Sequence, residues 1–138
     1  MGETCVTYAR KNDAKSEIAL SSLIWALHEP ARLNPAARAA IEDPANSVLY
    51  SAGSVWELEL KASKGKLSLP EGWIDVATTT GFVELPVTGQ DAAAGARLPW
   101  IHNDPFDRLF VAQAKRHGFK LATRDAYMKQ YAVEVFAV

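Results

Sequence analysis

Three acidic residues occupy positions where a chain of alternating strands and helices would bring them together. Glu57 lies on the helix after the second predicted strand, Asp107 at the start of a later helix, and Asp125 two residues past the fourth predicted strand. In open parallel sheets, ligands bind beyond the carboxyl ends of the strands. Carboxylates that meet there repel one another unless a proton or a cation intervenes, and the hard ions Mg²⁺ and Mn²⁺ prefer oxygen ligands. Such a site suits metal-assisted attack of water on a phosphodiester.

Each acid also has an ordinary structural interpretation. Asp104 and Asp107 have the spacing of an N-cap and an N3 residue, so both could serve only to start a helix. Glu57 and Lys61 have the i, i+4 spacing that is typical of a solvated ion pair on a surface helix. Asp125 is equally a candidate N-cap of a short helix. The joint placement of the acids, rather than any one of them, indicates a site.

Hydrophobic patterning and capping residues predict the elements that hold these acids. The predicted strands cover residues 16–20, 47–51, 81–86, 119–123 and 133–137. The predicted helices cover residues 23–27, 35–43, 55–64, 70–79, 88–98, 105–117 and 125–130. Strands that alternate with helices imply crossover connections and a parallel sheet covered on both faces. The expected fold class is therefore α/β, with three α/β/α layers around a central parallel sheet of about five strands.

Composition limits the class of protein. A chain of 138 residues makes one domain, with residues 1–15 expected as an N-terminal extension and 16–138 as the domain. The single cysteine, Cys5, excludes an internal disulfide framework and fits a reducing cytoplasm. Lys and Arg number 15 against 16 Asp and Glu, which argues against a protein that coats nucleic acid. No apolar stretch approaches the roughly 20 residues of a membrane span.

The histidines and tryptophans give no separate signal in the sequence. His28, His102 and His117 are scattered, without the clustering that a histidine metal site needs. The four tryptophans are expected as core or interface anchors. Trp25 and Trp56 fall within apolar helix patterns, whereas Trp73 and Trp100 are candidates for an exposed groove.

Four segments, taken in order and spacing, resemble PIN-domain proteins of the VapC toxin family. They are LIWALHEPARLNPAARAAIEDP (23–44), SAGSVWELELKASKGKLSLP (51–70), HNDPFDRLFVAQAKRHG (102–118) and LATRD (121–125). The likeness extends from Ser16 to Val138. It implies a PIN-like α/β/α fold and a toxin-like endoribonuclease that uses Mg²⁺ or Mn²⁺. It also implies inhibition by a cognate antitoxin protein, and a homodimer.

Residue by residue, the resemblance implies that Glu57, Asp107 and Asp125 are the catalytic acids and metal ligands. Polar positions expected to support them are Asp104, Arg108 and Thr123. The basic residues expected nearest a bound RNA are Lys61, Lys64, Lys66, Arg108 and Arg124. For the lysines, an exposed and solvated helix face is an equal alternative.

The first acid of the family pattern is missing. Family members typically carry an aspartate at the end of the first strand, where this chain has Ala19 or, with a two-residue deletion, Ser21. A site that lacks one carboxylate holds a divalent cation less well and activates water less. The alternative function is therefore a weak or inactive PIN-fold protein that binds an antitoxin or RNA without turnover.

Overall fold

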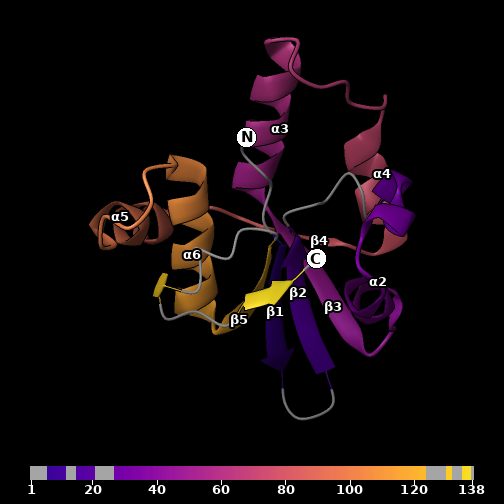
Figure 1. The fold of residues 1–138 in the computed structure, drawn as a ribbon, viewed down its shortest axis with the longest axis horizontal. Coiled ribbons are helices and arrows are strands. Elements are labelled where there is room, and N and C mark those ends of the chain that lie inside the picture. Colours follow the sequence, from indigo (N-terminus) through magenta and orange to yellow (C-terminus); the bar gives the residue numbers. More distant parts are fainter. Residues whose placement is uncertain (1–5, 12–14, 21–26, 124–129, 132–134, 138) are drawn as a thin grey trace.

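The computed structural model describes residues 6–11, 15–20, 27–123, 130–131 and 135–137 (Figure 1). The strands are β1 (Val6–Lys11), β2 (Lys15–Leu20), β3 (Asn46–Ser51), β4 (Val83–Leu85), β5 (Phe119–Thr123) and β6 (Val135–Ala137). The helices are α2 (Pro35–Glu42), α3 (Ala52–Ser63), α4 (Trp73–Thr80), α5 (Gly89–Arg97) and α6 (Pro105–His117), with a 3-10 helix η1 (Pro30–Arg32). The predicted helices over 23–27 and 125–130 lie almost entirely outside the described residues.

The strands form a six-stranded sheet in the order β4-β3-β2-β1-β5-β6, and β2 also pairs with β5. Strand β2 runs parallel to β3 and β5, β3 runs parallel to β4, and β5 runs parallel to β6. Strand β1 is antiparallel to both of its partners, β2 and β5. The α/β class is confirmed, but the sheet is mixed, whereas a parallel sheet of about five strands was expected.

The N-terminal segment differs from the expected extension over residues 1–15. Residues 6–11 form β1, in which Val6 lies opposite Leu20 and Lys11 opposite Lys15. Val6, Thr7 and Tyr8 are residue types that favour strands, and a strand pairs through its backbone even where its side chains are polar. The absence of an apolar run therefore did not exclude a strand. That residues 16–138 make up the domain on their own stays a prediction.

Helices cover both faces of the sheet. Figure 1 shows α2 and α4 on one side of the sheet and α5 and α6 on the other. One buried cluster packs on the side of α2 and α4, and its members are Leu33, Ala37, Val48, Leu49, Tyr50, Leu58, Trp73, Ala77 and Phe82. A second cluster packs on the side of α6, and its members are Leu98, Phe110, Val111, Ala112, Ala114, Leu121 and Tyr131. Among the described residues, no helix is long and apolar enough to cross a membrane.

Helix α6 begins and ends where its sequence predicts. The Asp104 carboxylate accepts hydrogen bonds from the backbone N–H groups of Phe106 (2.9 Å) and Asp107 (3.2 Å), and Pro105 occupies the first helical position. At the other end, Gly118 adopts the left-handed conformation, with φ of 71°. The N-terminal cap fixes the first turn of α6, which carries Asp107.

An ion pair between a buried aspartate and an exposed arginine joins α5 to α6. The Asp91 side chain is fully buried and forms a capping box with Thr88, in which Asp91 Oδ2 lies 3.0 Å from the Thr88 nitrogen. Asp91 Oδ1 accepts a hydrogen bond from the guanidinium of Arg116 on α6. Burial alone raises the pKa of Asp91, but the hydrogen bonds from Thr88 and Arg116 outweigh it and hold that pKa below its ordinary value.

We expect Asp91→Asn to lower the free energy of unfolding at neutral pH by about 2 kcal/mol, because the charged hydrogen bond to Arg116 is lost. A carboxyl whose pKa is lower in the folded chain stabilises the fold above its unfolded pKa, about 3.9. This contribution is lost as the pH falls through the folded pKa, so the gap in the free energy of unfolding should narrow between neutral pH and a pH well below about 3.9. Urea unfolding at both pH values measures this difference. A gap that stays constant would contradict the assignment, and Asp75→Asn, at an exposed acid on α4, is the matched control.

Candidate active site

Glu57 lies in the middle of α3, on the buried face of the helix. The helix follows directly on β3, and the Ser51 hydroxyl caps it by accepting a hydrogen bond from the Gly53 N–H at 3.0 Å. The Glu57 side chain points into the protein and is only 2% exposed. The Lys61 ammonium lies 3.4 Å from Glu57 Oε2. The i, i+4 pair therefore exists, but the interpretation as a solvated surface pair is wrong for Glu57.

Helix α3 packs closely against the first turns of α6. A Cβ atom at Gly53 would lie 2.7 Å from Leu109 Cδ2, so glycine permits this approach. One turn further along α3, the Trp56 and Phe106 rings meet edge to face, with centroids 5.4 Å apart. Glu57 and Asp107 each come directly after one member of this aromatic pair. The helix contact thus brings the segments of these two predicted acids together.

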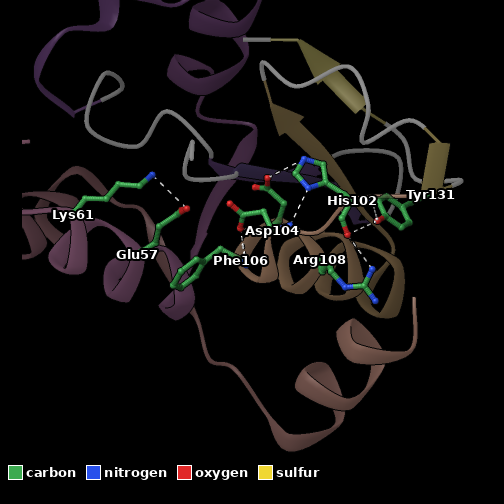
Figure 2. Close-up of polar contacts among 8 residues, drawn as sticks. Glu57, Lys61, His102, Asp104, Phe106, Arg108 and Tyr131 are labelled. Carbon is green, nitrogen blue, oxygen red and sulfur yellow. Dashed lines mark hydrogen bonds and ion pairs between the residues drawn. The ribbon is translucent and has the colours of Figure 1, made fainter. Parts of the chain in front are cut away.

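Asp107 is buried beside a histidine. Its side chain lies at the start of α6 and is 9% exposed, and its Oδ2 is 3.4 Å from His102 Nε2. Figure 2 shows Glu57, from α3, and Asp104, from the start of α6, on the same side of the two helices, with His102 next to Asp104. Asp104 acts as the helix cap, as predicted. Because Asp104 supplies the cap, the Asp107 carboxylate is not needed to start the helix.

Arg108 holds the loop that precedes α6. Its buried guanidinium donates four hydrogen bonds to backbone carbonyls, and the acceptors are the oxygens of Ala96 (3.2 Å), Leu98 (2.8 Å), Pro99 (3.0 Å) and His102 (3.1 Å). The Trp100 ring lies over the same guanidinium, 3.8 Å from carbon to centroid. That Arg108 supports the site stays a prediction. Its charge is buried against carbonyls, which does not favour the expected contact with RNA.

Two of the remaining predicted positions lie near the carboxyl ends of central strands. Ala19 lies opposite Leu121 in the parallel pairing of β2 with β5, and Thr123 is the last residue of β5, opposite Ala137. The carboxyl ends of β2, β3 and β5 therefore meet at the edge from which α3 leaves. Asp125 and Arg124 lie outside the described residues.

The donors present have the right chemistry for a hard divalent cation, since Glu57 and Asp107 are buried carboxylates. However, no three histidine, cysteine, aspartate or glutamate side chains form a group that could hold a metal within the part of the chain that the structure describes. The described residues alone therefore give an incomplete metal site. A third ligand would have to come from Asp125 or another residue outside them.

An apolar groove of about 570 Å³ lies beside the site, between α3, α5 and the first turn of α6. Two tryptophans line it, Trp56 with 63% of its surface exposed and Trp100 with 74%. Trp56 is therefore not a core residue, and its expected role as an interface anchor stays a prediction. The expectation of an exposed groove is wrong for Trp73, because it is buried and its indole N–H donates to Glu59 Oε2 at 2.9 Å.

Comparison with known proteins agrees with this architecture. Residues 21–134 match the PIN domain, and the chain belongs to the PIN-domain family, within which it is of the VapC type. The chain is 32% identical over 115 residues to Ribonuclease VapC22 of Mycobacterium tuberculosis (strain ATCC 25618 / H37Rv). The aligned residues cover 78% of this chain and 84% of that relative. No solved structure matches the chain. The resemblance to VapC proteins that the four sequence segments indicate is thereby confirmed.

Proposed function

We propose that this protein is a toxin-like endoribonuclease that hydrolyses RNA phosphodiester bonds. The observation that carries the proposal is the pair of buried carboxylates, Glu57 and Asp107, at the contact between α3 and α6 in a PIN-domain chain. Burying a carboxylate costs free energy, so two buried carboxylates in adjoining segments are typical of a functional site. The relative named a ribonuclease supports RNA as the substrate.

The proposal includes Mg²⁺ or Mn²⁺, held by Glu57, Asp107 and Asp125. When bound, such an ion lowers the pKa of a coordinated water and stabilises charge on the phosphate. Asp104 and Arg108 contribute by fixing the helix start and the preceding loop, and Thr123 ends β5 two residues before Asp125 in the sequence. Lys61, whose ammonium lies at the edge of the site, is the candidate for a phosphate contact, with Arg124.

Metal removal tests this proposal. We expect the purified chain to cut single-stranded RNA with Mn²⁺ or Mg²⁺ and to lose cleavage on addition of EDTA, because the carboxylates alone do not activate water. Restoring Mn²⁺ in excess should restore the cleavage, whereas Ca²⁺ should restore it poorly, because it takes more ligands at longer distances. Cleavage that persists in EDTA would contradict the metal-dependent mechanism. A gel assay with a labelled RNA measures each case.

The likeness to a VapC protein supports proposals about partners and location. We propose that a small antitoxin protein inhibits this chain, that the chain forms a homodimer, and that it is located in the cytoplasm. Sedimentation should give about twice the chain mass of 15.1 kDa. A monomeric mass at micromolar concentration would overturn the dimer.

A second candidate function rests on Ala19. It lies one residue before the end of β2, beside β5, and the resemblance puts the missing acid at Ala19 or, with a two-residue deletion, at Ser21. A site without that acid suits a PIN-fold protein that binds RNA or an antitoxin with little turnover. RNA binding without cleavage, at saturating Mn²⁺, would favour this second function over the first.

A further inference from the structure

His102 is fixed in place by its own backbone. Its N–H donates to the Tyr131 hydroxyl at 2.7 Å, and its carbonyl accepts a hydrogen bond from Arg108 at 3.1 Å. Both partners are buried, Tyr131 at 3% exposure and Arg108 at 4%. Figure 2 shows these two residues on the far side of His102 from Asp104. The histidine is therefore anchored from behind, and its ring faces the first turn of α6.

The contacts of the ring determine which nitrogen carries its proton. The backbone N–H of Asp104 donates to His102 Nδ1 at 3.2 Å, so Nδ1 must present a lone pair. In the neutral ring the proton then sits on Nε2, the nitrogen that lies 3.4 Å from Asp107 Oδ2. The same Asp104 whose backbone orients the histidine also caps the helix that carries Asp107. The three residues form one closed set of contacts.

We propose that His102 is a positioning residue that holds Oδ2 of Asp107, so that the other carboxylate oxygen turns toward the proposed metal site. This inference rests on the proposed function, because it gives Asp107 its role there. Carboxylates at metal sites are commonly oriented by hydrogen bonds from neighbouring groups, and losing such a neighbour typically costs about 10–100-fold in metal affinity or activity. Both ring nitrogens already face protein groups, so in this arrangement His102 is not itself a ligand.

Two substitutions separate the two ring contacts. In His102→Asn, the amide oxygen occupies the place of Nδ1 and accepts from Asp104, but no donor reaches Asp107. In His102→Gln, the longer side chain places an N–H near the position of Nε2. We expect His102→Asn to weaken Mn²⁺ binding and to lower kcat by about tenfold or more, with KM for RNA unchanged. His102→Gln should recover much of both losses.

Mn²⁺ affinity is measured by electron paramagnetic resonance, and the carbon shift of the Asp107 carboxyl by NMR of the metal-free protein. A shift that moves in His102→Asn and returns in His102→Gln supports the positioning role. If wild-type protein cuts RNA but His102→Asn matches it in Mn²⁺ affinity and kcat, the positioning role is wrong and the proposed function stands. If wild-type protein does not cut RNA but the carboxyl shift still follows the two variants, the positioning role stands and the proposed function is wrong. A Gln variant no better than Asn in every readout also overturns the positioning role.

Discussion

Asp107→Asn is expected to lower the rate of RNA cleavage by about a thousandfold, while the folded state keeps its stability. A thousandfold loss corresponds to about 4 kcal/mol of barrier, which is typical when a direct metal ligand loses its charge. The amide keeps the size of the carboxyl and an oxygen that can accept from His102, so the start of α6 should be unchanged. Removing a negative charge from the neighbourhood of Glu57 should not weaken the fold.

Single-turnover cleavage with Mn²⁺ and thermal unfolding are the two measurements. Asp75→Asn is the control, because it makes the same chemical change at an exposed acid of α4, away from the α3–α6 contact. Equal cleavage by the Asp107 variant and wild type would exclude this site as the place of catalysis. A loss of about 4 kcal/mol in the free energy of unfolding, equal to the expected rise in the barrier, would mean that Asp107 is a structural residue.

Ala19→Asp should act in the opposite direction and raise both Mn²⁺ affinity and the cleavage rate by tenfold or more. The reason is the position of Ala19 near the end of β2, beside β5 and at the sheet edge from which α3 leaves. An added carboxylate there would give the ion one more oxygen ligand and more negative charge. Each tenfold gain corresponds to about 1.4 kcal/mol.

Ser21→Asp is the matched variant, since the family pattern places the acid at residue 21 if the chain has a two-residue deletion. Calorimetry of Mn²⁺ binding compares the two. A gain in Ala19→Asp alone fixes the alignment of the first strand, and a gain in Ser21→Asp alone shifts it. If neither variant binds Mn²⁺ more tightly, the site does not lack an acid at this strand.

Capping residues made much of the fold predictable from the sequence. Asn34 followed by Pro35, and Asp104 followed by Pro105, give helix starts that the structure confirms, because these signals are local and need no tertiary partner. Strand β1 was missed because its pairing is a backbone property, and polar flanking residues hid the short strand-favouring run. The role of Asp91 was missed for a different reason, since its partner Arg116 is 25 residues away in the chain.

The candidate site was predictable in part. Sequence position alone placed Glu57 and Asp107 in the right elements, but it gave no measure of burial, and the exposed fraction of 2% is what removes the surface-pair interpretation of Glu57. His102 was set aside because histidines were sought as a cluster. Its contacts come instead from a helix cap and a distant tyrosine, Tyr131, and the available signal was its place two residues before the cap Asp104.

The four carbonyl contacts of Arg108 have a consequence for genetics. The side chain that secures the loop and the side chain proposed for catalysis are consecutive residues, so a screen for harmless variants of the proposed toxin would recover changes at both. Those at Arg108 would leave four backbone carbonyls, that of buried Leu98 among them, without their donor and would reduce the yield of soluble protein. Those at Asp107 would leave the yield intact. Measuring the amount of soluble protein together with toxicity would distinguish changes at these two neighbouring positions, which a survival assay alone does not.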